Sequence, residues 1–117
     1  MSDTVLDQIK EQIGDNPILL YMKGSPQAPQ CGFSAQTVHH LIQCGERFAY
    51  VDILSNPEIR AELPGYANWP TFPQLYVDGE LVGGCDIVTE MHESGELQTL
   101  IKDCAARHAD PAEAAED

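Results

Sequence analysis

Residues 17–34, PILLYMKGSPQAPQCGFS, combine an apolar run, a loop with two prolines, and a lone thiol where a second apolar pattern begins. The run PILLYM is bounded by Pro17 and Gly24 and is typical of a buried strand. After Cys31 the apolar residues recur at helical spacing until Gly45, which favours a helix that ends there. The stretch therefore predicts a strand that leads through a loop into a helix, with Cys31 near the start of that helix.

Helices and strands alternate along the rest of the chain. Thr4 with Asp7 predicts a capping box for a first helix that ends at Gly14. The next segments predict a strand over residues 48–53 and a short helix that Ser55 and Asn56 begin and Pro64 closes. Two strands, over residues 74–77 and 80–82, are predicted around the hairpin turn Asp78-Gly79. A last helical stretch is predicted to be capped by Asp86 and to break near Ser94-Gly95. The helix after Cys31 is expected to bury Ala35, Val38, Leu41 and Ile42.

This order places a parallel crossover before a hairpin, which makes a mixed sheet with helices on its faces. We predict an α/β fold with a four-stranded mixed sheet flanked by helices, in the thioredoxin-like arrangement. One domain is expected over residues 1–109, since 117 residues with 43% hydrophobic content suffice for one core. Residues 110–117, DPAEAAED, have four acids and no bulky apolar residue, which predicts a disordered acidic tail.

Charge and composition argue against several classes of function. The net charge of −13 and the pI near 4.4 disfavour nucleic acid or an anionic membrane as a partner. No apolar run approaches the roughly 20 residues that span a bilayer, and the first residues do not resemble a signal peptide. Four cysteines without a secretory signal are expected to be reduced thiols. We therefore expect a cytoplasmic protein.

Cys31 has the setting of a reactive thiol. The unpaired N–H groups and the positive dipole end at a helix start favour a thiolate, and Lys23 at the end of the preceding strand adds positive charge. A redox-active C-x-x-C motif has a second thiol that resolves the first, but Ser34 occupies that place. The alternative, a small buried hydrophobe, conflicts with the position of Cys31 in a loop beside Gly32.

The motifs around this thiol resemble those of a known family. KGSPQAPQCGFS (residues 23–34) and WPTFPQLYVDGELVGGCD (residues 69–86) are similar to sequences of monothiol, CGFS-type glutaredoxins of the single-domain bacterial kind. The resemblance extends from about Thr4 to Arg107. Its specificity lies in the combination of a lysine eight residues before the thiol, W-P-T-x-P about forty residues after it, and then G-G-C-D.

The resemblance implies a glutathione site, and the residue types suit this acidic tripeptide, which has two carboxylates and one amine. Lys23 and Arg60 are expected to pair with its glycine carboxylate. The other implied contacts are Thr71, Phe72 and Pro73, a loop in which glutaredoxins place a cis proline facing the thiol, and Gly84, Cys85 and Asp86 at a helix start. Phe72 would offer its backbone to the glutathione cysteine, and Asp86 its carboxylate to the γ-glutamyl amine.

Each of these contacts has a plainer alternative. Arg60 alone would be interpreted as a solvated helix charge, and Asp86 as a helix cap. The stretch 71–73 would be an ordinary turn that ends in proline. Trp69 belongs to the family's signature beside the site, although a single tryptophan is more often a packing residue.

The missing second thiol is explained by the cofactor that the family binds. A [2Fe-2S] cluster takes four thiolates, and the resemblance implies that Cys31 and one bound glutathione from each of two subunits supply them. Ser34 then removes a competing disulfide. On this interpretation the chain is a homodimer when loaded, acts in cluster assembly and storage, and transfers the cluster to apo iron-sulfur recipient proteins.

Two alternative functions remain open. Cys31 alone suffices to remove glutathione from protein mixed disulfides, as a glutathione-dependent oxidoreductase does. CGFS-type members perform this reaction poorly, so at most a weak enzyme is expected. The family also pairs with BolA-type proteins, which replace one thiolate with a histidine, and a cluster-dependent adaptor is the second alternative.

The other cysteines are expected to be structural. Cys44 lies about 20 Å from Cys31 at helical rise, and Cys104 falls on an apolar stripe, so both are predicted to be core residues. Cys85 at a helix start is the candidate for a disulfide with Cys31, and this is the less favoured interpretation.

The histidines do not form a metal motif. His39 and His40 are adjacent on a helix and point about 100° apart, so they cannot chelate one metal together. His92 and His108 are predicted to be surface residues. The sequence has no H-x-E and no paired C-x-x-C pattern.

Overall fold

The centre of the fold is strand β1 (Ile18–Met22), all of whose residues are buried. The computed structural model describes residues 4–108, so the predicted acidic tail lies outside the described residues. Alternate side chains of β1 pack into two hydrophobic clusters, Ile18, Leu20 and Met22 into one and Leu19 and Tyr21 into the other. An uninterrupted apolar run is what a strand requires when both faces of its sheet are covered.

The sheet has four strands in the order β4-β1-β5-β6. β4 (Ala49–Asp52) runs parallel to β1, whereas β5 (Gln74–Val77) runs antiparallel both to β1 and to β6 (Glu80–Gly83). The β5–β6 hairpin turns at Asp78-Gly79, and both residues have positive φ, 52° and 82°, as a tight two-residue turn requires. The predicted thioredoxin-like mixed sheet is confirmed.

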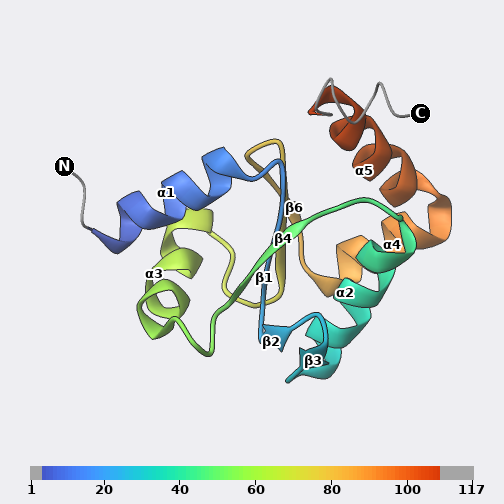
Figure 1. Ribbon diagram of the computed structural model, residues 1–117. Helices are drawn as coiled ribbons and strands as arrows, with labels where there is room; N and C mark the ends of the chain where they lie inside the picture. The colour runs from blue at the N-terminus through green and yellow to red at the C-terminus, as the bar shows by residue number, and fades with distance from the viewer. Residues whose placement is uncertain (1–3, 109–117) are drawn as a thin grey trace.

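Helices cover both faces of the sheet (Figure 1). On one face lie α1 (Val5–Asp15) and α3 (Pro57–Ala67), and on the other α2 (Gly32–Gln43), α4 (Cys85–Ser94) and α5 (Glu96–Arg107). The predicted cap of α1 is present, because Thr4 Oγ1 accepts a hydrogen bond from the Asp7 N–H at 3.1 Å. In the part of the chain that the structure describes, no helix is both long and apolar enough to cross a membrane.

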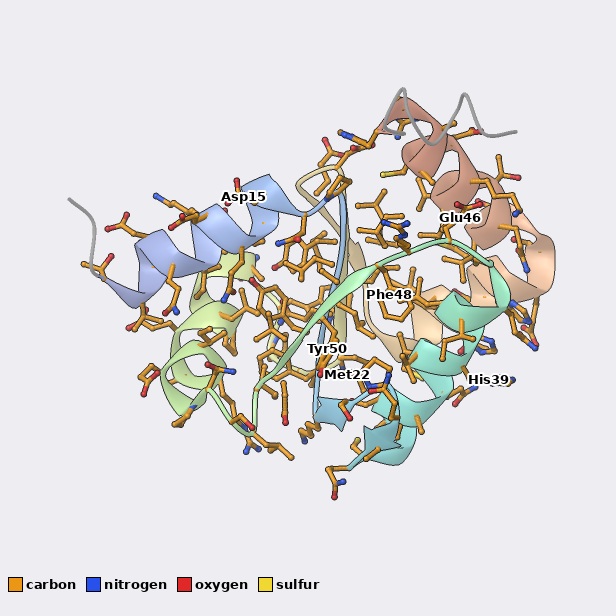
Figure 2. The ribbon with its side chains drawn as sticks, viewed as in Figure 1. Asp15, Met22, His39, Glu46, Phe48 and Tyr50 are labelled. Carbon is orange, nitrogen blue, oxygen red and sulfur yellow. The ribbon has the colours of Figure 1, made fainter. Side chains whose placement is uncertain are left out.

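The side chains between sheet and helices form the two clusters of the core (Figure 2). Phe48, which precedes β4, packs against the cluster beneath α2, α4 and α5. Ile42 does not, although it was predicted to be buried: its exposed fraction is 53%. The buried face of α2 is turned toward Ser34 and Thr37 instead, and Thr37 is satisfied there because its hydroxyl donates to the Phe33 carbonyl at 2.9 Å.

Two helix boundaries differ from prediction. Pro64 lies inside α3 and does not close it, since a proline near a helix end removes one N–H while its carbonyl still accepts a bond, here from Trp69 N at 3.1 Å. The N-cap of α4 is Gly84, so Asp86 lies in the first turn and is not the cap. A small hairpin of β2 (Gly24–Ser25) and β3 (Ala28–Pro29), which was not predicted, precedes α2.

Candidate functional site

A cavity of about 770 Å³ lies where the end of β1, the start of α2, the loop before β5 and the start of α4 meet. A volume of this size is within the range of small-molecule sites. Every residue predicted for the site lines it: Lys23, Cys31, Arg60, Thr71, Phe72, Pro73, Gly84, Cys85 and Asp86. Residues far apart in the sequence are thus brought to one concave surface, with Phe33 and Trp69 beside them.

Cys31 is the N-cap of α2 and is partly exposed. A hydrogen bond from the Ser34 N–H lowers the pKa of its thiol, helped by the Phe33 N–H, the charge of Lys23 and the Ser34 hydroxyl, while partial burial opposes the shift. The free N–H groups at the helix start are therefore the main cause of the lowered pKa. This arrangement favours a thiolate that faces the cavity.

Ser34 has a positioning role that the sequence did not reveal. Its side chain is fully buried, and its Oγ accepts a hydrogen bond from the Lys23 N–H at 3.0 Å. The residue in the second place of C-x-x-S therefore ties α2 to the end of β1. Through this contact the thiol and the lysine that lowers its pKa are held in one unit.

The loop before β5 forms another part of the cavity wall. The Phe72-Pro73 peptide bond is cis, as predicted. Gln74, which is fully buried, holds the loop by donating from Nε2 to the carbonyls of Trp69 at 3.1 Å and Thr71 at 3.2 Å. Sequence reasoning missed this role, although a glutamine at the start of an otherwise apolar strand was a possible signal.

The start of α4 closes the cavity. Gly84 is its N-cap, and a Cβ on Gly84 would lie only 3.2 Å from the Pro73 carbonyl oxygen and 3.3 Å from Trp69 Nε1. A side chain at this position would have to push the loop or the Trp69 ring back by a few tenths of an ångström, so glycine allows the close approach of loop and helix. Cys85 and Asp86 follow as the first residues of α4, where unpaired N–H groups favour an anionic ligand.

The four cysteines are all free thiols, and they differ in setting. Cys44 and Cys104 are buried, as predicted, and burial raises the pKa of each. Cys85 lines the cavity, and its sulfur lies 3.6 Å from Gln36 Oε1 on α2. Cys31 is therefore the cysteine whose position and charge state suit chemistry at the cavity.

One group of potential metal ligands lies outside the cavity. Ligand atoms of Asp78, Cys104 and His108 lie within 4.8 Å of one another. Asp78 is already engaged, since Arg107 donates to one of its oxygens and His108 Nε2 lies 2.6 Å from the other. We interpret the group as a structural contact that fixes the end of α5 to the β5–β6 turn.

Two of the four histidines, His40 and His92, pack between helices. The exposed His108 contacts Asp78, whereas His92 is half-buried and is not the simple surface residue that was predicted. Its ring stacks on that of His40, with ring centroids 4.2 Å apart, and this contact joins α2 to α4.

Comparison with known proteins identifies the family. The Glutaredoxin family model matches residues 18–82. The chain is 72% identical over 105 residues to Glutaredoxin 4 of Escherichia coli (strain K12), covering 90% of this chain and 91% of that protein. Reduced apo GrxS14 from poplar superposes with a TM-score of 0.75 at 41% identity, covering 88% and 94% of the two chains. A buckwheat glutaredoxin–glutathione complex superposes with a TM-score of 0.75 at 25% identity, covering 87% and 91%.

The site and the relatives agree. The thiol at the start of α2 is followed by a buried serine in place of a second thiol. Relatives named Glutaredoxin 4 from several bacteria cover most of the chain, that of Pasteurella multocida at 68% identity among them. The chain belongs to the glutaredoxin family and is a monothiol glutaredoxin of the single-domain kind found in bacteria.

Proposed function

We propose that the protein binds glutathione in this cavity and, as a pair of subunits, holds a [2Fe-2S] cluster that it stores and delivers to apo iron-sulfur proteins. The observation that carries the proposal is the single accessible thiol of lowered pKa, Cys31, at the rim of a cavity suited to an acidic peptide. Four free cysteines fit a reducing compartment, and we place the protein in the cytoplasm.

The charges of the cavity match those of glutathione. Lys23 and Arg60 both line the cavity and would supply cations for the glycine carboxylate. The start of α4 would offer N–H groups to the γ-glutamyl carboxylate, and Asp86, which also lines the cavity, would pair with the amine. The loop with Phe72 offers backbone groups to the central cysteine residue. The relative whose complex with glutathione has been solved supports the same ligand.

Thiolate counting supports a cluster shared by two subunits. A [2Fe-2S] cluster needs four thiolates, and one subunit offers one suitable protein sulfur, Cys31. Bound glutathione supplies a second sulfur, so two subunits supply four. Phe33, whose side chain is 62% exposed beside the thiol, provides apolar surface that a second subunit or a BolA-type partner would cover.

The exposed thiolate also supports a second candidate function, a weak glutathione-dependent oxidoreductase. The Cys31 thiolate would attack the glutathione sulfur of a protein mixed disulfide, releasing the protein thiol and forming a Cys31–glutathione disulfide. A second glutathione thiolate would then reduce that disulfide and leave as oxidised glutathione. This route needs no thiol at position 34.

Anaerobic reconstitution tests the proposal. The apo protein is supplied with iron, sulfide and either glutathione or no thiol ligand, and its visible spectrum and molar mass are measured. We expect cluster absorption and a dimer only with glutathione. Cys31→Ser should abolish both, whereas Cys85→Ser, which removes the neighbouring sulfur and keeps the N–H group, should retain both. Equal cluster loading in Cys31→Ser would contradict the proposal.

A further inference from the structure

Three hydrogen bonds from separate parts of the chain hold the backbone of Lys23 and Gly24. Its N–H donates to Ser34 Oγ at 3.0 Å, and its carbonyl accepts from Gln30 N at 2.9 Å. The next N–H, that of Gly24, donates to Asp52 Oδ1 at 2.9 Å. Gly24 has a φ of 91°, and a Cβ there would lie 2.5 Å from the Ala28 carbonyl oxygen, so the chain reverses here in a shape open only to glycine.

Asp52 is the last residue of β4 and sits beside the end of β1. It pairs with Met22 in the parallel register, and the N–H of the next residue, Ile53, donates to the Met22 carbonyl at 2.9 Å. Its carboxylate thus lies directly after the ladder, where it reaches the first peptide of the loop that leads to Cys31. Figure 2 labels Met22 at this end of the sheet.

The same residue organises the segment that starts α3. Asp52 Oδ1 also accepts from the Leu54 N–H at 2.9 Å, and Oδ2 accepts from the Ser55 hydroxyl at 3.0 Å. Its backbone carbonyl accepts from Asn56 Nδ2 at 2.9 Å, and the Asn56 carbonyl accepts from the Arg60 N–H at 3.1 Å. One residue therefore links the loop of Lys23 to the turn of helix that carries Arg60.

The carboxylate is ionised in this setting. Burial raises its pKa, but hydrogen bonds from the Gly24 and Leu54 N–H groups and from Ser55 outweigh burial and bring the pKa below its usual value. The pattern of acceptors is asymmetric, because both N–H groups bond to Oδ1. Oδ1 is therefore the atom that joins the two segments.

We propose that Asp52 is a positioning residue of the site: it sets the placement of Lys23 and Arg60 relative to each other and to Cys31, and so controls how tightly the cavity holds the carboxylate of glutathione. The part that concerns glutathione rests on the proposed function, whereas the part that concerns Cys31 does not. Asp52 does not line the cavity and acts through the residues that do.

Three substitutions separate geometry from charge. Asp52→Asn removes the charge but keeps an oxygen that can accept both N–H groups, and its NH₂ can donate to the Ser55 hydroxyl. Asp52→Glu keeps the charge but moves the carboxylate by one methylene. Asp52→Ala removes both. The control is Asp15→Ala, an exposed carboxylate at the end of α1 that lies before the start of β1, whereas Met22 and Asp52 lie at the far end of that strand (Figure 2).

Two readouts are measured with the thermal midpoint. Calorimetric titration with glutathione should show a dissociation constant raised at least about threefold in Asp52→Ala and Asp52→Glu, since displaced charge-assisted contacts lose much of their strength. Asp52→Asn and the control should stay within about twofold of wild type. The pH midpoint of Cys31 alkylation should rise in Asp52→Ala and Asp52→Glu, in the direction that Lys23→Ala produces, and this rise should be smaller in a Lys23→Ala background.

Several results would overturn the proposal. One is unchanged affinity and an unchanged alkylation midpoint in Asp52→Ala and Asp52→Glu despite a lower thermal midpoint, which would make Asp52 purely structural. Another is Asp52→Asn behaving like Asp52→Ala, which would assign the effect to charge. If Asp52→Ala fails to fold, the Asn and Glu variants decide. If wild type does not bind glutathione, the proposed function fails, and the alkylation midpoints still decide the role of Asp52.

Discussion

Replacing Ser34 by cysteine restores a C-x-x-C motif and tests why the second thiol is missing. The two residues are three positions apart at the start of α2, where helix geometry puts their Cα atoms about 5 Å apart, and this Cα distance falls in the range that a disulfide bridges. The side chain of Ser34 is fully buried and contacts the Lys23 N–H, so we expect the introduced sulfur to be held in the same place, close to Cys31. We expect Ser34→Cys to convert a metal-binding thiol into half of a disulfide.

The structure also sets a stability cost for the reduced variant. Ser34 Oγ accepts from the Lys23 N–H, and sulfur is a weak acceptor, so about 1 kcal/mol of hydrogen bonding is lost. A larger atom in a fully buried position costs about 1 kcal/mol more. The free energy of unfolding should fall by about 2 kcal/mol in total. Ser34→Ala, which loses the bond without adding volume, should lose about 1 kcal/mol.

The assay compares wild type, Ser34→Ala and Ser34→Cys. After treatment with oxidised glutathione, alkylation and mass measurement should find an internal disulfide only in Ser34→Cys. Its reconstituted cluster should lose visible absorption faster in air, and its disulfide-reductase turnover should rise, because a resolving thiol is now present. A Ser34→Cys cluster as durable as wild type, with no gain in turnover, would refute the reasoning. Equal lability in Ser34→Ala would assign the effect to the lost hydrogen bond.

Two further predictions concern the charges of the site. Lys23→Ala and Arg60→Ala should each weaken glutathione binding by about 1.5–3 kcal/mol in a calorimetric titration, with thermal midpoints near wild type. Asp86→Ala should also weaken glutathione binding. Because Asp86 is not the cap of α4, this substitution should lower the free energy of unfolding by only about 0.3–1 kcal/mol. The alkylation rate of Cys31 should hold its plateau to lower pH in the folded protein than in urea, because folding lowers the pKa of the thiol; by linkage this ionisation stabilises the fold above the unfolded pKa, and the contribution is lost as pH falls through the folded pKa. An identical profile in the folded and unfolded protein would contradict the lowered pKa.

The sequence predicted those features that depend on local chemistry. The apolar run of β1, the Asp78-Gly79 turn and the cap at Thr4 each follow from the residues that form them, and each is confirmed. Eight of the nine predicted site residues lie in the two motifs, Arg60 was implied by the family resemblance, and all nine line one cavity. Their contacts with glutathione remain predictions.

The features that escaped prediction have different physical causes. Asp52 bonds to Gly24, which only the fold brings near, so spacing along the chain gives no sign of this contact. Gln74 bonds to the nearby carbonyls of Trp69 and Thr71, and a glutamine at the start of an apolar strand was the signal for it. Ile42 follows the helical period, but the buried face of α2 is turned toward Ser34, which leaves Ile42 exposed. Pro64 looked like a helix end because sequence rules do not show how one lost N–H is tolerated.

The central claim is that two subunits and two glutathione molecules share one cluster through Cys31. Native mass spectrometry of the anaerobically reconstituted protein measures this stoichiometry directly, because the intact assembly is weighed with its ligands. We expect a species with the mass of two chains, two glutathiones and one [2Fe-2S] unit, which disappears in Cys31→Ser. A cluster-loaded monomer, or a loaded dimer without glutathione, would contradict the account.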